Sequence, residues 1–248
     1  MQRVLVVGGS EEYPGAVYLA AMSAMRSGDS SVIVMAPTRV AWTLNALSPD
    51  LMTRKLPGSH LSPRHERAIL KQLKTADVLV LGNGATTRKP AAKLMRRLMR
   101  LPIQKVIDAD ALKVLKGAAI KNAILTPNEG EWRSLVKNSN VRTLQKHNVI
   151  IKKGARTEIL AASRKSAMPR VNPGLEKAGM GDVLAGLCAG QLAHGNDMFF
   201  AAREACALGN KIADILTKRK RGYFFLASDI IGEMKKARRT RVTPASKV

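Results

Sequence analysis

The chain has 248 residues, 46% of them apolar, which fits one large α/β domain with a single buried core. No apolar run approaches the ~18 residues that cross a bilayer, and the apolar start at residues 3–7 is too short for a signal peptide. Because Lys and Arg number 42 against 18 acids, the formal net charge is +24, and polyanions have to be considered as partners. The composition excludes a membrane-spanning protein, and we expect a cytoplasmic one.

Short apolar runs alternate with helix-like segments along most of the chain. Strands are predicted at residues 3–7, 31–35, 77–81, 105–107, 123–125, 149–152 and 157–161. Helices are predicted at residues 15–26, 63–74, 91–100, 111–115, 130–137, 182–194, 198–216 and 228–238, and the pattern of residues 38–62 is ambiguous. The alternation predicts an α/β fold, a mainly parallel sheet with helices on both faces. We assign residues 1–239 to this single domain and expect the basic tail 240–248 to be frayed.

Ligands of open α/β sheets bind beyond the carboxyl ends of the strands, so the residues after each strand are candidates for a site. The Gly8-Gly9-Ser10 turn follows the first strand, but it is not the GxGxxG dinucleotide motif, and a tight strand-to-helix turn explains it equally well. Gly82-Asn83-Gly84 follows the third strand and would let a ligand approach the backbone closely, although alone it is a weak signal.

Acidic and amide side chains follow the next two strands. Asp108 and Asp110 would repel each other if both were buried, unless a cation or a helix start stabilises them, and Asp110 could equally be an N-cap. Asn128 and Glu131 lie three residues apart at a predicted helix start, where they could hold a hydrated Mg²⁺ through its waters. An N-cap with an acidic first turn is the competing explanation for this pair.

The strongest single segment is residues 172–186. Gly179, Met180 and Gly181 precede an apolar helix, so free backbone N–H groups at its positive end can form an anion hole for a transferring phosphoryl group. Asp182 lies at the same helix start, where a carboxylate is stabilised as the anion and should have a low pKa. We interpret Asp182 as a base that takes a hydroxyl proton, with a mere helix cap as the alternative.

Several stretches, in order and at compatible spacing, resemble the ADP/ATP-dependent NAD(P)H-hydrate dehydratases, a carbohydrate-kinase-related family of the ribokinase-like superfamily. They read VLVVGGSEEYPGAVYLAA, ADVLVLGNGAT, VIDADAL, ILTPNEGEW, VIIKKGARTEIL and NPGLEKAGMGDVLAGLCAGQLAHG. The resemblance implies a lyase that repairs hydrated NADH or NADPH: ADP or ATP phosphorylates the added hydroxyl, and phosphate is then eliminated. It also implies Mg²⁺ as cofactor and homo-oligomers in many members. We expect the companion epimerase domain of some members to be absent, since nothing precedes Met1.

The resemblance also implies roles for individual residues. Asp182 would be the catalytic base, and the backbone of Gly179 and Gly181 would stabilise the transferred phosphoryl group. The nucleotide-binding residues would be Lys153, Gly154, Ala155, Arg156, Thr157 and Gly181. The substrate pocket would be lined by Ala16, Gly84, Asn128 and Asp182. A magnesium ion would be held, through water, by Asn128 and Glu131.

The chain departs from the family pattern at three turns. Asn83 replaces the proline of a Gly-Pro-Gly turn, and Asn128 replaces a histidine that follows Thr-Pro. In the Gly-Gly-Thr-Gly-Asp loop, Ala178 replaces a glycine and Met180 replaces the threonine. A backbone anion hole survives these changes, whereas a side-chain donor at Met180 does not, so the departures bear mainly on substrate identity.

Two other functions fit parts of the pattern. A small-molecule kinase of the same superfamily, acting on a vitamin precursor or a sugar, would use the same anion hole and base but release the phosphorylated product. A nucleic-acid-binding protein would use the +24 charge, yet aromatic residues are only 4% of the chain and interleave with no basic stretch. We therefore expect an adenine nucleotide and hydrated NADH or NADPH as partners, rather than nucleic acid or a membrane.

Overall fold

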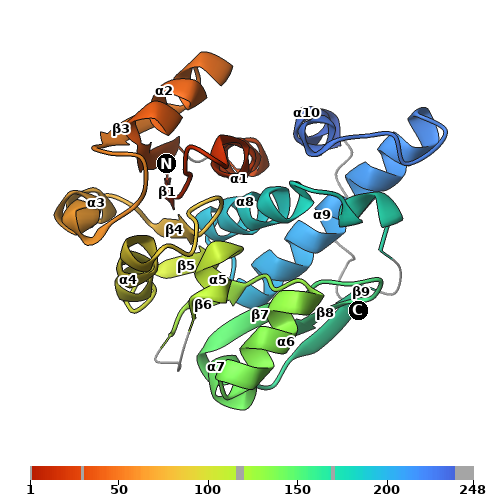
Figure 1. Cartoon of the computed structure of the whole chain (residues 1–248). Coiled ribbons are helices and arrows are strands. Elements are labelled where there is room, and N and C mark those ends of the chain that lie inside the picture. Colours follow the sequence, from red (N-terminus) through yellow and green to blue (C-terminus); the bar gives the residue numbers. More distant parts are fainter. Residues whose placement is uncertain (1, 29–30, 116–119, 169–170, 238–248) are drawn as a thin grey trace.

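The computed structural model describes residues 2–28, 31–115, 120–168 and 171–237 (Figure 1). Its strands are β1 (Arg3–Val7), β2 (Ser31–Pro37), β3 (Met52–Leu56), β4 (Val78–Leu81), β5 (Gln104–Ile107), β6 (Ala123–Leu125), β7 (Asn148–Lys152), β8 (Thr157–Leu160) and β9 (Lys165–Met168). They form one sheet in the order β3-β2-β1-β4-β5-β6-β7-β8-β9. Neighbouring strands are parallel from β3 to β7, and the pairs β7-β8 and β8-β9 are antiparallel. The predicted mainly parallel α/β sheet is confirmed.

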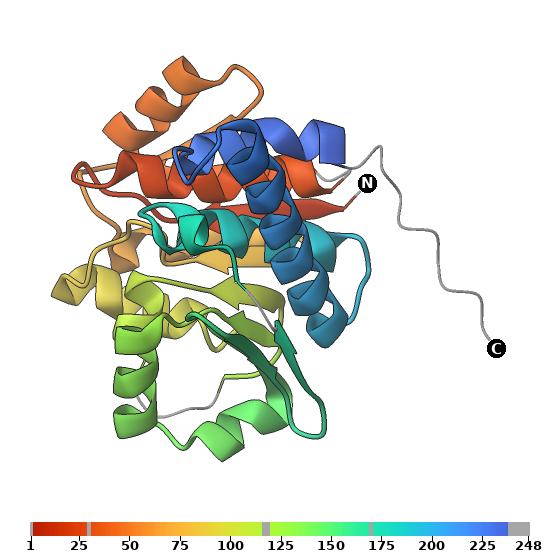
Figure 2. The ribbon, with the colours of Figure 1, turned by 90° about the vertical axis from the view of Figure 1, so that its right-hand side faces the viewer.

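Helices cover both faces of this sheet (Figures 1 and 2). One face carries α1 (Pro14–Ser27), α2 (Thr38–Leu47), α8 (Met180–Ala193), α9 (Met198–Arg219) and α10 (Ala227–Ala237). The other carries α3 (Glu66–Leu73), α4 (Lys89–Leu98), α5 (Asp110–Lys113), α6 (Glu129–Asn138) and α7 (Val141–His147). Successive strand residues point to opposite faces, so Val4 and Val6 of β1 join the first core and Leu5 and Val7 the second. Short 3₁₀ helices span Pro63–His65 and Pro173–Glu176.

Among the α-helices and strands described, four were not predicted: α2 and β3 in the ambiguous segment 38–62, α7, and the edge strand β9. Both β3 and β9 lie at the ends of the sheet, and most of their residues are exposed or half-buried, so they carry no buried apolar run that would mark a strand. The helix predicted at residues 228–238 is α10, which is described over Ala227–Ala237; residue 238 and the tail 240–248 lie outside the described residues. Within the described part, no helix combines the length and hydropathy that crossing a bilayer requires.

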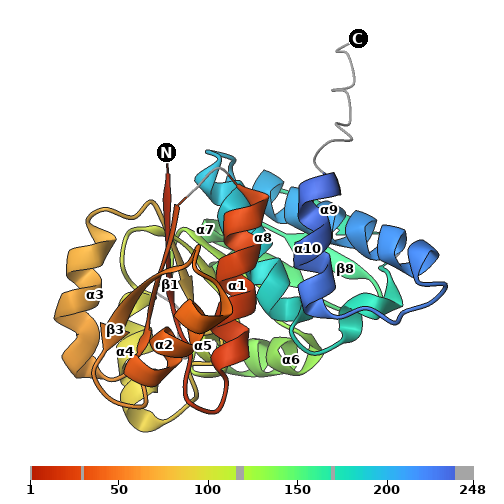
Figure 3. The same cartoon turned by 90° about the horizontal axis from the view of Figure 1, so that it is seen from above.

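Two helices far apart in sequence, α1 and α8, lie side by side on the sheet (Figure 3). Small residues on both helices allow this close approach, and the hydroxyl of Ser23 in α1 donates to the carbonyl of Val183 in α8 at 2.7 Å. This packing holds the start of α8 beside the carboxyl ends of the central strands, where ligands of this fold class bind.

Lys105 in β5 has a charge with no acidic partner among the described residues. Its side chain is fully buried, and its Nζ donates to the carbonyl of Lys121 at 2.6 Å. Burial lowers the pKa of Lys105 to about 8 from an ordinary value of 10.5. Between these values the unfolded chain binds more protons than the folded one, so the stability of the fold rises with pH across that window.

We therefore expect Lys105→Met to raise the free energy of unfolding at pH 7, because the substitution removes a buried charge and keeps the side-chain volume. The variant should also lose part of the increase in stability that the wild type shows between pH 8 and 10.5. Urea denaturation at several pH values would measure both effects. Lys121→Met, at an exposed position, is the matched control and should keep the wild-type pH dependence; a Lys105→Met curve that does the same would contradict the assignment.

Candidate functional site

Polar side chains from four parallel strands and one helix meet at the carboxyl edge of the sheet. Asn83, Asp108, Thr126 and Lys153 follow β4, β5, β6 and β7 respectively, and Asp182 lies in the first turn of α8. Asn83, Asp108 and Thr126 are buried, whereas Lys153 and Asp182 are half-buried. The edge at which the sequence predicted a site is therefore the edge at which these groups converge.

Hydrogen bonds join these side chains into one network. The amide Nδ2 of Asn83 donates to Oδ1 of Asp182 at 2.7 Å and to Oδ2 of Asp108 at 3.0 Å. The other oxygen of Asp108, Oδ1, accepts from the hydroxyl of Thr126 at 2.6 Å and from Nζ of Lys153 at 3.3 Å. Asp108 is thus held by three donors, and Asp182 is connected to it through Asn83.

The pKa of Asp182 is raised to about 7 from an ordinary value of 3.8. Burial is the largest cause and the charge of Asp108 the second, whereas the hydrogen bond from Asn83 and the charge of Lys153 lower the pKa. The low pKa expected from the helix N-terminus is therefore wrong, because burial and a neighbouring carboxylate outweigh the helix dipole. A carboxylate that titrates near pH 7 is well matched to accepting a proton at neutral pH.

The start of α8 supplies backbone donors next to Asp182. Gly179 adopts a left-handed conformation (φ 82°) as the N-cap, and the first helical bond runs from the N–H of Val183 to the carbonyl of Gly179 at 3.0 Å. The N–H groups of Gly181 and Asp182 therefore precede the helical ladder. A Cβ on Gly181 would lie 3.1 Å from Nζ of Lys153, so the backbone and the ammonium group face the same small space. This arrangement suits a phosphoryl group.

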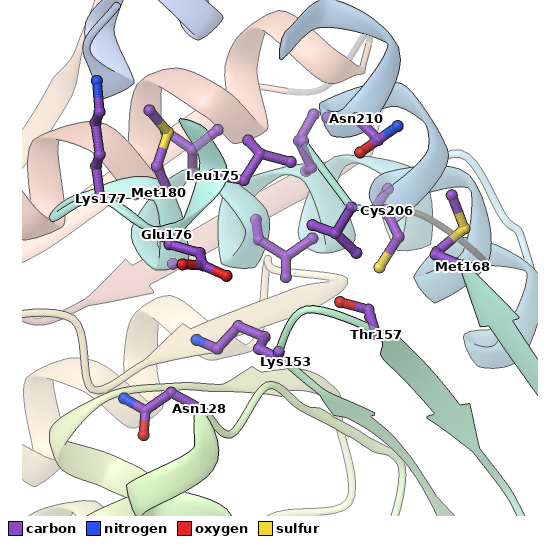
Figure 4. Close-up of a pocket in the computed structure, with 18 of the residues that line it drawn as sticks. Asn128, Lys153, Thr157, Met168, Leu175, Glu176, Lys177, Met180, Cys206 and Asn210 are labelled. Carbon is purple, nitrogen blue, oxygen red and sulfur yellow. The ribbon is translucent and has the colours of Figure 1, made fainter. Parts of the chain in front are cut away.

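A cavity of about 650 Å³ opens beside this space, between the β7-β8 turn and helices α8 and α9 (Figure 4). Of the predicted nucleotide-binding residues, Lys153, Gly154, Ala155, Thr157 and Gly181 line it; Arg156 is exposed and is not among the lining residues. The remaining wall is mostly apolar and includes Met168, Leu175, Leu184, Leu187, Ala205 and Cys206. The sequence did not mark these residues, because they come from separate elements that only the folded chain brings together.

The predicted substrate residues divide between two places. A Cβ on Gly84, whose φ is +64°, would lie 2.5 Å from the carbonyl of Tyr13 and 3.1 Å from Cβ of Ala16, so Gly84 and Ala16 are neighbours. Asn83 connects this turn to Asp182. Asn128, by contrast, lies on the wall of the cavity with Lys153 (Figure 4).

The predicted magnesium pair forms a capping box at the start of α6. The N–H of Glu131 donates to Oδ1 of Asn128 at 2.9 Å, and the N–H of Asn128 donates to Oε2 of Glu131 at 3.0 Å. Burial raises the pKa of Glu131 above its ordinary value, although the hydrogen bond from the backbone of Asn128 and the charge of Lys153 act in the opposite direction. The described residues contain no group of three His, Cys, Asp or Glu side chains that could hold a metal directly.

Asp110 is not an N-cap, although the sequence left that role open. It is the first residue of α5, the cap position is taken by Ala109, and no side chain bonds there. Instead, Oδ2 of Asp110 accepts from the N–H of Thr86 at 2.9 Å, and Oδ1 accepts from Lys113 at 2.9 Å. Asp110 therefore fixes the loop that follows Gly84.

Comparisons with known proteins identify the family of this chain. The model of a family described as NAD(P)H-hydrate dehydratase matches residues 4–236. The bifunctional NAD(P)H-hydrate repair enzyme Nnr of Pyrobaculum aerophilum is 32% identical, over 92% of this chain and 49% of the relative. The chain thus spans about half the length of the curated relatives that it matches.

Solved structures show the same fold. A ribokinase-like superfamily protein of Enterococcus faecalis has a TM-score of 0.79 at 23% identity, covering 96% of this chain and 87% of that chain. The ADP/ATP-dependent NAD(P)H-hydrate dehydratase of Bacillus subtilis, co-crystallized with ATP and Mg²⁺, has a TM-score of 0.73 at 24% identity, covering 94% and 88%. The fold is ribokinase-like, and by the match over residues 4–236 the chain belongs to the NAD(P)H-hydrate dehydratase family.

Proposed function

We propose that this chain repairs hydrated NADH or NADPH by nucleotide-dependent dehydration. The observation that carries the proposal is the position of Asp182. Its carboxylate, with a pKa raised to about 7 by burial and by Asp108, accepts a hydrogen bond from Asn83 in the turn that contains Gly84, and its neighbours Gly181 and Val183 line the cavity. A base placed between a substrate site and a nucleotide site is what phosphorylation of a substrate hydroxyl requires.

The cavity provides a site for the adenine nucleotide. Its apolar wall, which includes Leu187 and Cys206, suits an adenine ring, and its polar end carries Lys153 and Gly181. The phosphates would lie at this end, against the backbone at the start of α8. Thr157 lies farther along the same wall, toward the apolar end (Figure 4).

Asp182 and the backbone donors have different roles in the reaction. As the hydroxyl oxygen on the hydrated ring attacks the terminal phosphorus of ADP or ATP, its proton passes to Asp182 and the bond to the leaving nucleotide breaks. The N–H groups of Gly181 and Asp182, together with Lys153, stabilise the negative charge on the transferred phosphoryl group. Loss of phosphate from the ring carbon, with loss of a proton from the neighbouring carbon, then restores the double bond of the reduced nicotinamide.

Magnesium belongs to the same proposal. Asn128 and Glu131 already bond to each other, so they fit a hydrated ion held through water rather than direct coordination. Mg²⁺ bound in this way with the nucleotide would neutralise phosphate charge.

The test is an absorbance assay on hydrated NADH with Mg²⁺ and either ADP or ATP. We expect the absorbance of reduced nicotinamide to recover with the wild type and not with Asp182→Asn. A small-molecule kinase of the same fold would instead convert alcohols into stable phosphate esters, without any recovery of absorbance. That result, obtained with folded protein, would overturn the proposal.

A further inference from the structure

We propose that Asn83 is a positioning residue for this reaction, because its single amide nitrogen holds the carboxylates of Asp108 and Asp182 at the same time. The inference rests on the proposed role of Asp182 as the base. Nδ2 of Asn83 lies 3.0 Å from Oδ2 of Asp108 and 2.7 Å from Oδ1 of Asp182. An amide nitrogen has two hydrogens, so both are used by these two acids.

The backbone around Asn83 cannot readily move. The side chain is fully buried, and the carbonyl of Asn83 accepts from the N–H of Gly9 at 2.8 Å. The flanking glycines, Gly82 and Gly84, have φ angles of 115° and 64°, and a Cβ on Gly82 would lie 2.2 Å from the carbonyl of Asp108. The turn is therefore packed against its neighbours on both sides, and the direction of the Asn83 side chain is set by the fold.

Folding stability does not explain an asparagine at this position. Its Oδ1 is buried without a hydrogen-bond partner among the described residues, which is unfavourable for a carbonyl oxygen. The family resemblance implies proline here, and a proline side chain has no donor. What asparagine adds is a neutral donor aimed at two acids, so the contact is a feature of this chain.

Four groups act on Asp182 from the elements packed around it. Asp108 and Asp110 disfavour its ionised form, whereas Lys153 and the hydrogen bond from Asn83 favour it. The ammonium of Lys153 bonds to Asp108 and not to Asp182. Within the described part of the chain, Asn83 is the side chain that donates to the Asp182 carboxylate, so its loss leaves two facing acids without a shared donor.

The test compares Asn83→Leu, similar in shape but without a donor, and Asn83→Pro with the wild type. NMR of protein labelled at the aspartate carboxyl carbons reports the pKa of Asp182 without any substrate, and Asp182→Asn assigns the signal. We expect the pKa of Asp182 to rise by about one unit. The acid limb of the pH profile of kcat/KM should move by the same amount, which lowers the rate on that limb about tenfold.

Thr126→Val is the matched control. Like Asn83, Thr126 is a buried and uncharged side chain that donates to Asp108. The substitution removes this 2.6 Å hydrogen bond and leaves the contacts of Asp182 in place. We expect it to leave the pKa of Asp182 unchanged, because the hydrogen bond that it removes does not reach the Asp182 carboxylate. If Asn83→Leu leaves the pKa of Asp182 unchanged, or if Thr126→Val raises that pKa by as much as Asn83→Leu does, the positioning role is wrong.

Two further measurements keep the result interpretable. If Asn83→Leu does not fold, judged by circular dichroism, Asn83→Asp replaces it. This variant keeps the shape of the side chain and adds a third carboxylate, so the pKa of Asp182 should rise above its wild-type value. An unchanged pKa there would also overturn the inference. If the titrations shift as expected but the wild type does not restore reduced nicotinamide, the contact between Asn83 and Asp182 stands and the proposed function falls.

Discussion

Asp182→Asn is expected to lower turnover by about 100- to 10,000-fold, the usual consequence of losing a positioned base. Asparagine keeps the shape of the side chain and an oxygen that can accept from Asn83, but it cannot take up the hydroxyl proton. Because the side chain remains in place, the affinity for the nucleotide should stay within about threefold of the wild-type value while the chemical step slows. Single-turnover kinetics and calorimetric titration of the nucleotide would separate the two effects.

The stability of the same variant provides a second readout. The folded pKa of Asp182, about 7, lies above its ordinary value of 3.8, so between these values the folded chain holds the extra proton. Stability contributed by this group is therefore lost as the pH rises through that window. Asp182→Asn should be as stable as the wild type near pH 4 and more stable at pH 8, as measured by thermal melting.

Wild-type activity should follow the same titration. Below pH 7 the rate should fall as Asp182 takes up a proton, and above pH 7 this limb should level off. Turnover of Asp182→Asn within about threefold of the wild type would reduce Asp182 to a structural residue in the first turn of α8.

Gly186→Ala is expected to destabilise the fold by about 3 kcal/mol or more, at the upper end of the range for overpacked cores. A Cβ at this position would lie 2.2 Å from the carbonyl oxygen of Ala20, 2.7 Å from Cβ of Ser23 and 2.9 Å from the backbone nitrogen of Ala24. Two of these atoms are backbone atoms of α1, so no side-chain rotation relieves the contact. Helices α1 and α8 must separate, which also displaces the start of α8 and Asp182.

Gly232→Ala is the matched control for this substitution. Gly232 lies in α10, and a Cβ there would meet nothing within 4 Å. Replacing a helical glycine by alanine without a contact should stabilise the fold by about 0.5–1 kcal/mol. Urea denaturation of the two variants should therefore show changes of opposite sign. A free energy of unfolding for Gly186→Ala at or above that of the wild type would mean that α1 and α8 do not pack as described.

Most of the sheet could be predicted from sequence because its strands are buried on both faces. Runs such as residues 4–7 and 78–81 are apolar without interruption, and they alternate with helical segments, which is the pattern of a parallel sheet. The edge strands β3 and β9 lack this signal because solvent reaches them. The short α7 also remained unassigned, with only Leu144 of its residues buried.

The sequence by itself determined where the candidate site lies, because local features sufficed: glycines at residues 179 and 181, an acid at the following helix start, and polar residues after each central strand. Only the tertiary structure decided the state of that acid. The helix dipole, a local effect, predicts a low pKa for Asp182, whereas the folded chain withdraws much of its side chain from water and brings Asp108 and Asn83 to it from the ends of β5 and β4. Burial and contacts between distant strands depend on how the sheet is assembled, and no pattern around residue 182 reveals them.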